Sequence, residues 1–156
     1  MTDTVPKLLI ATDGSDYGQN AILQGMELAI LMDANVYVLY VLDKKAYVPP
    51  ILKTSIPLGS KWDIMEETLR QEGNEAIQYA KKVAKDKGVD IETVIIEGDP
   101  AHTILEFAEQ NKVNLVIMGA LGKGGLERFL LGSVADKVVK HSKISVLLVT
   151  DKIFNS

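Results

Sequence analysis

The hydrophobic positions of this chain follow two spacings in alternation. Short runs of mostly apolar residues, rich in Val, Ile and Leu, are typical of strands buried in a parallel sheet. Between these runs, apolar residues recur every three or four positions, as on the buried face of a helix. Five strands and four helices are therefore predicted to alternate, with the strands at 7–12, 35–43, 91–96, 114–118 and 144–149.

The predicted helices begin at residues that suit helix N-termini. Ser and Asp cap the first backbone N–H groups, and Pro in the first turn loses no needed hydrogen bond. In the second helix, Asp63 stands where it would complete a capping-box-like pair with Ser60, and Gly88 would end the helix. The four helices are expected to start at Ser15 or Asp16, near Ser60, at Asp99-Pro100 and at Gly132-Ser133.

Strict alternation of strands and helices determines the expected architecture. Parallel strands need crossover connections, and crossovers within one sheet are right-handed. We therefore expect an α/β fold, Rossmann-like, with a single doubly wound five-stranded parallel sheet and helices on both faces. Residues 1–156 would form one domain, since this length suits a single core. Ligands in such sheets bind outside the carboxyl ends of the strands.

Composition argues against several classes of partner. The net charge is -4, so no global positive field attracts nucleic acid. There are no cysteines, and the two histidines, His102 and His141, stand far apart in sequence, which argues against thiolate and zinc chemistry. No apolar stretch approaches the roughly 20 residues of a membrane span, and the N-terminus lacks a secretory pattern. A cytoplasmic protein without a membrane partner is expected.

The glycine-rich segment 119–133, GALGKGGLERFLLGS, carries the candidate chemistry. Glycine lets the backbone approach a ligand closely, and a helix N-terminus presents N–H groups with partial positive charge, so both favour phosphate. A Walker loop is excluded because no Lys-Ser or Lys-Thr follows a glycine at the required spacing. After the first strand, DGSDYG places acids where a dinucleotide pyrophosphate would sit, which argues against NAD and FAD.

The spacing Gly119-x2-Gly122-x9-Gly132-Ser133 resembles the G-x2-G-x9-G-[ST] signature of nucleotide-binding universal stress proteins. The resemblance covers nearly the whole chain, since the TDGS turn, the order of elements, the LLGSVADKVV helix and the terminal SVLLV strand are also similar to that family. It implies an adenine nucleotide alpha hydrolase-like fold and ATP or AMP as ligand. Mg²⁺ or Mn²⁺ could also bind, through the nucleotide phosphates, and the sequence does not identify protein ligands for it.

The resemblance implies roles for the glycine segment. Gly119 would approach the ribose. Gly122, Gly132 and the Ser133 hydroxyl and amide would hold phosphates, assisted by the Val134 amide. The alternative is an ordinary flexible loop with a helix cap at Ser133. The single basic residues Lys123 and Arg128 of this segment are given no role.

The resemblance also implies an adenosine side. Asp13 would accept a hydrogen bond from the adenosine moiety, and Ala11 and Thr12 would line that wall. Val41 would contact adenine through its backbone, and Met118 belongs to the same nucleotide-binding set. Two alternatives remain open: Asp13 as a simple turn former, and Val41 as a packing residue.

Three functions compete at this stage. The first is a regulator that binds ATP or AMP and is read by a protein partner that the sequence does not identify. The second is a slow Mg-dependent ATP hydrolase, for which no catalytic residue can be named. The third is an interaction module without nucleotide turnover. The resemblance further implies a homodimer through Ile144 to Val149, and residues 44–59 receive no role.

Overall fold

The computed structural model describes residues 5–45, 58–122 and 131–150, with the backbone alone for 58–62. In these residues a five-stranded parallel sheet has the strand order β3-β2-β1-β4-β5. The predicted fold class is confirmed. The elements are β1 (Lys7–Ala11), α1 (Asp16–Met32), β2 (Asn35–Leu42), α2 (Leu58–Lys87), β3 (Ile91–Glu97), α3 (Pro100–Gln110), β4 (Leu115–Gly119), α4 (Ser133–His141) and β5 (Ser145–Val149).

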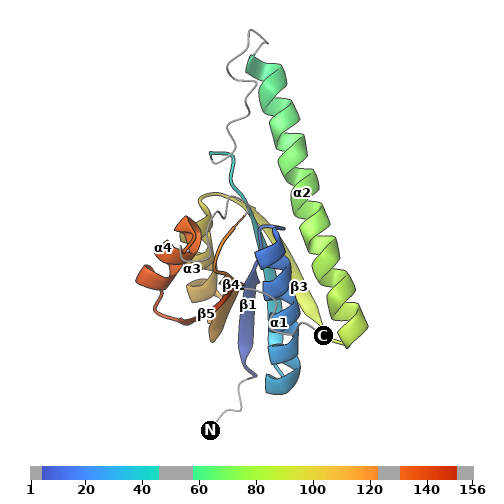
Figure 1. The fold of residues 1–156 in the computed structure, drawn as a ribbon, viewed down its shortest axis with the longest axis vertical. Helices are drawn as coiled ribbons and strands as arrows, with labels where there is room; N and C mark the ends of the chain where they lie inside the picture. The colour runs from blue at the N-terminus through green and yellow to red at the C-terminus, as the bar shows by residue number, and fades with distance from the viewer. Residues whose placement is uncertain (1–4, 46–57, 123–130, 151–156) are drawn as a thin grey trace.

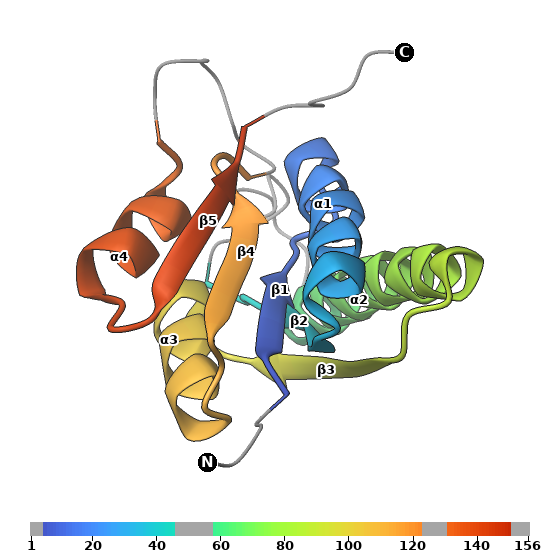
Figure 2. The same ribbon diagram turned by 90° about the horizontal axis from the view of Figure 1, so that it is seen from below.

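Helices cover both faces of the sheet. Figure 2 shows α1 and α2 on one face and α3 and α4 on the other. This follows from the strand order, because right-handed crossovers from β1 through β2 to β3 place their helices on one face. The return across β1 to β4 and β5 places the later helices opposite.

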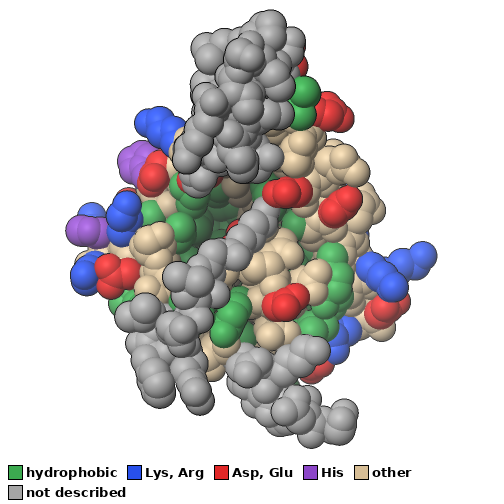
Figure 3. Space-filling view, turned by 45° about the horizontal axis from the view of Figure 1, so that its top comes forward, with side chains coloured by type: hydrophobic (Ala, Val, Ile, Leu, Met, Phe, Trp, Pro, Cys, Tyr) green, Lys and Arg blue, Asp and Glu red, His purple; other side chains and the backbone are tan. Residues whose placement is uncertain are grey.

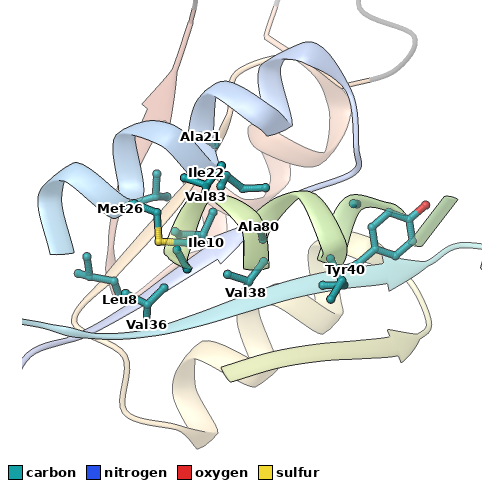
Figure 4. Close-up of a cluster of buried hydrophobic side chains, with 14 of the residues drawn as sticks. Leu8, Ile10, Ala21, Ile22, Met26, Val36, Val38, Tyr40, Ala80 and Val83 are labelled. Carbon is teal, nitrogen blue, oxygen red and sulfur yellow. The ribbon is translucent and has the colours of Figure 1, made fainter. Parts of the chain in front are cut away.

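Alternating side chains of the strands fill two separate cores. Leu8 and Ile10 of β1 point to the α1 and α2 side, where Figure 4 shows them beside Met26 and Val38. Leu9 and Ala11 point to the α3 and α4 side. Each fully buried Leu or Ile contributes roughly 1.5–3 kcal/mol through burial. The central strand is buried on both faces, which explains its continuous apolar run.

Helix α2 starts near Ser60 as predicted, but without the predicted capping pair. The helix begins at Leu58, so Ser60 lies inside it and the predicted pair of Ser60 with Asp63 is not at its N-terminus. Pro57 precedes Leu58 in the sequence, and proline is favoured at helix starts, so it was a competing signal. The 30-residue helix is about 45 Å long, and its N-terminal half extends past the sheet in Figure 1.

Helix length alone could suggest a membrane segment. In the described part of the chain, however, no helix combines the length and the apolar character needed to cross a membrane.

The strand order reverses beside β1. The chain leaves β1 for β2 and β3 on one side, and then crosses to β4 and β5 on the other. At such a reversal the two connections leave the sheet in opposite directions, and ligands of doubly wound sheets bind in the crevice expected there, between the carboxyl ends of β1 and β4. The segments that follow these two strands are therefore the ones to examine for a ligand site.

Candidate functional site

The turn after β1 forms one wall of the crevice. The Thr12 amide donates to the Leu39 carbonyl at 3.0 Å, and the Thr12 Oγ1 accepts from the Gly14 amide at 3.2 Å. Gly14 has a φ of 80°, a left-handed conformation that glycine adopts without steric penalty. Both predicted residues, Ala11 and Thr12, are buried here, so they help to build the wall.

Asp13 is both a turn former and part of this wall. Its Oδ1 accepts hydrogen bonds from the Ser15 amide at 2.9 Å and from the Ser15 hydroxyl at 2.5 Å. The same hydroxyl accepts from the Gly18 amide at 3.1 Å and so caps α1. The prediction of a helix start at Ser15 is confirmed.

The segment after β4 forms the opposite wall. The Ala120 amide donates to the Val149 carbonyl at 2.9 Å, and the Ala120 carbonyl accepts from the Gly132 amide at 2.8 Å. A β-carbon built on Gly119 would lie only 2.7 Å from the Tyr17 Cβ, so the first turn of α1 packs directly on this glycine. Close approach of two backbones is thus the local reason for glycine at 119.

The two walls meet at Asp13 and Gly122. A β-carbon built on Gly122 would lie 2.7 Å from the Asp13 Oδ2. A β-carbon built on Gly132 would lie 3.1 Å from the Ala120 carbonyl oxygen and 3.6 Å from the Gly122 amide nitrogen. The structure therefore brings together Asp13, Gly122 and Gly132, which are far apart in sequence.

The N-terminus of α4 opens at this junction. Gly132 is its N-cap and provides no side-chain hydrogen bond. The first N–H groups of the helix, at Ser133, Val134 and Ala135, have no carbonyl partner within the helix, and they carry a partial positive charge. Ser133 is exposed and Val134 is partly buried. The predicted helix start at Gly132-Ser133 is confirmed.

The predicted adenosine residues share one face of the sheet. Ala11 pairs with Met118 in register, and both are buried in the core on the α3 and α4 side. Val41 packs against the same core from β2, where it pairs with Ile96. Because β1 separates β2 from β4, Val41 lies two strand spacings from the glycine segment, roughly 10 Å.

Charged groups border the site where β2 ends. The Lys44 Nζ lies 3.2 Å from the Glu97 carboxylate and 3.5 Å from that of Glu66 on α2. The hydrogen bond with Glu97 raises the pKa of Lys44. The hydrogen bond from Arg70, together with the Lys44 charge, lowers the pKa of Glu66. These ion pairs connect α2 to the ends of β2 and β3.

Acidic side chains lie on the α2 side of the Asp13 turn. A hollow of about 270 Å³ is lined by Asp13, Gly14, Gln19, Glu72, Glu75 and Ala76. Figure 3 turns this edge of the sheet toward the viewer and shows acidic side chains on both sides of a recess lined by hydrophobic side chains. Among the described residues, no three His, Asp or Glu side chains are placed to hold a metal ion.

Sequence reasoning did not assign Ser15, Tyr17 and Gly18 to the site. Each of them contacts an assigned residue: Ser15 bonds Asp13, Tyr17 packs on Gly119, and Gly18 lies against Asp13. The Asp-Gly-Ser turn is a sequence signal for the first contact, because Asp side chains often bond the backbone two residues on. The packing of Tyr17 on Gly119 is long-range and has no local signal. Lys123, Arg128 and most of 44–59 lie outside the described residues.

Comparison with known proteins points to one family. The model of the universal stress protein family matches residues 4–150. Universal stress protein MJ0531 of Methanocaldococcus jannaschii is 43% identical over 143 residues, which are 92% of this chain and 81% of the relative.

Solved structures agree in fold. MJ0577, from the same archaeon, has a TM-score of 0.79 at 29% identity, and the match covers 95% of this chain and 97% of that chain. A universal stress protein solved in complex with cAMP has a TM-score of 0.63 at 25% identity, covering 92% of this chain and 95% of that one.

Proposed function

This chain belongs to the universal stress protein family, and on that premise we propose that it binds an adenine nucleotide, ATP or AMP, between the carboxyl ends of β1 and β4. Binding would favour one conformation or assembly, which a partner protein would recognise. A related protein in complex with cAMP supports an adenine nucleotide as the ligand class.

One observation carries the proposal. Asp13, Gly122 and Gly132 converge beside the N-terminus of α4, which has no side-chain cap. In the proposed pose, phosphate oxygens accept from the Ser133 and Val134 amides, where the helix dipole favours negative charge. The nucleoside extends toward Asp13 and the end of β2. The strand spacing of roughly 10 Å between β4 and β2 suits the length of a nucleoside.

Calorimetric titration tests this function directly. Purified protein, confirmed free of co-purified nucleotide, is titrated with ATP, ADP and AMP, with and without Mg²⁺. We expect saturable binding of at least one of these adenine nucleotides. Absence of binding to all three would support the interaction-module alternative.

Hydrolysis is a separate alternative in the same site. Mg²⁺ needs only one or two carboxylates when substrate phosphates provide further oxygens, so a slow Mg-dependent ATPase is compatible with the fold. The proposal assigns no catalytic residue. If the protein released phosphate from ATP at steady state with Mg²⁺ but not without it, the protein would be an enzyme and not only a regulator.

The assembly is proposed to be a homodimer through β5. This strand pairs with β4 on one side, and Val146, Leu147 and Leu148 are only partly buried. An apolar sheet edge favours pairing with another strand, and two copies of one strand can pair about a twofold axis. Light scattering should give twice the mass of the chain. A monomer at all accessible concentrations would contradict the dimer.

A further inference from the structure

The carboxylate of Asp13 is held by a neighbour that the proposed function has not used. Ser15 donates to the Asp13 Oδ1 twice, from its amide and from its hydroxyl. The hydroxyl oxygen also accepts from the Gly18 amide. One serine side chain therefore connects the N-terminus of α1 to the carboxylate at the crevice.

These bonds restrict how the carboxylate can turn. With Oδ1 bonded to Ser15, rotation about the Cβ–Cγ bond is restricted, and Oδ2 lies directly against Gly122. Gly18 has no side chain, and this leaves space for the Asp13 carboxylate in this orientation. A β-carbon built there would lie 2.9 Å from the Asp13 Oδ1 and 2.6 Å from the Thr12 Oγ1.

We infer that Ser15 is a positioning residue for nucleotide recognition: it presets Asp13 as an acceptor for a hydrogen-bond donor of the nucleoside. The inference rests on the proposed function and deepens it. An acceptor already oriented loses less conformational freedom on binding, which increases affinity.

Helix capping is the competing explanation for Ser15, and three variants separate the two roles. Ser15→Thr is the conservative variant, since it keeps a hydroxyl that can cap and donate. Ser15→Gly keeps an acceptable N-cap residue but removes the hydroxyl. Gly18→Ala keeps Ser15, raises helix propensity, and displaces Asp13 by the close contacts of its new methyl group.

The test compares AMP with pyrophosphate, a probe that lacks the nucleoside. Calorimetry should show AMP affinity reduced about tenfold in Ser15→Gly and unchanged in Ser15→Thr. A loss of about tenfold is the size expected for one hydrogen bond to a charged group. Pyrophosphate affinity should be the same in all variants. In an Asp13→Asn background, Ser15→Gly should cause little further loss, since both changes act on one interaction.

Each result has a defined meaning. If wild-type protein binds no nucleotide, the proposed function fails and this inference with it. If wild type binds AMP and Ser15→Gly binds equally well, or loses AMP and pyrophosphate alike, the inference alone is overturned. Circular dichroism checks folding. Should Ser15→Gly not fold, Gly18→Ala decides in the same way, with loss of AMP but not of pyrophosphate expected.

Discussion

The N-termini of α1 and α4 lie at the same edge of the sheet and are built in opposite ways. At α1, the Ser15 hydroxyl caps the helix, and Asp16 adds a carboxylate in the first turn. At α4, Gly132 supplies no side-chain cap. The acidic residue in the first turn of α4, Asp136, forms an ion pair with Lys140 at 3.0 Å. The start of α1 is therefore capped by a side chain of the protein itself, whereas the start of α4 is open, which here means that it has no side-chain cap.

The third helix start on this edge supports the contrast. The Asp99 Oδ2 accepts from the His102 amide at 3.0 Å, so α3 is capped by a carboxylate as α1 is by a hydroxyl. A side-chain cap contributes typically about 1 kcal/mol to stability. Omitting it at α4 leaves N–H groups whose best partner is an external anion. In the proposed site, the stability that α4 lacks without a side-chain cap would be offset by its capacity to bind an anion.

The strongest test is to give α4 a carboxylate N-cap like the one on α3. Gly132→Asp places a carboxylate at the N-cap, and the glycine has a φ of -62°, which any residue adopts. The carboxylate occupies the proposed phosphate position and adds repulsion, so AMP affinity should fall about 100-fold or more, equivalent to about 2.7 kcal/mol. The melting temperature should stay near that of wild type, because the new cap offsets tight packing. Calorimetry and thermal unfolding measure the two effects.

A matched control separates charge from bulk. Gly132→Ala carries the same β-carbon, 3.1 Å from the Ala120 carbonyl oxygen, without the carboxylate. It should lose much less affinity than Gly132→Asp. Equal losses in both variants would show that packing on Ala120, and not an open helix start, explains the glycine.

Local signals in the sequence were sufficient for most of the fold. Ser15, Asp99 and Gly132 begin their helices as predicted, because capping depends on a few neighbouring residues. The strand order follows from alternation and right-handed crossovers. Helix α2 begins at Leu58, near Ser60 as predicted, but the predicted capping pair of Ser60 with Asp63 is not at its N-terminus, because Ser60 lies inside the helix.

The contacts within the candidate site could not be predicted in the same way. The Asp13 carboxylate meets Gly122, and Tyr17 meets Gly119, only because the strand order places β1 beside β4. Glycine is also ambiguous in a sequence. Gly25 and Gly122 are the same residue type, yet one faces the Ile10 side chain in the core and the other faces a carboxylate. The G-x2-G-x9-G-[ST] spacing indicated which glycines to examine, without giving their contacts.

A substitution in α1 sharpens the distinction between packing glycines and site glycines. A β-carbon built on Gly25 would lie 2.4 Å from the Ile10 Cδ1 and 2.7 Å from its Cγ1. Gly25→Ala should therefore overpack the core and lower stability by about 1–2 kcal/mol, after the gain in helix propensity. AMP affinity should not change. Urea unfolding measures the stability, and a loss of affinity at unchanged stability would contradict this role for Gly25.

The smallest effects compare the two serines at the helix starts. Ser15→Ala removes the cap of α1 and should lower stability by about 1 kcal/mol. Ser133 is exposed and follows the N-cap of α4, so Ser133→Ala should change stability by less than about 0.5 kcal/mol. It should still weaken AMP binding several-fold by removing a hydroxyl from the proposed phosphate site. Urea unfolding and calorimetry on both variants give the four values. If Ser133→Ala lowered stability as much as Ser15→Ala and left binding intact, then Ser133 would stabilise α4 as Ser15 stabilises α1, and α4 would no longer be the open helix start at this edge.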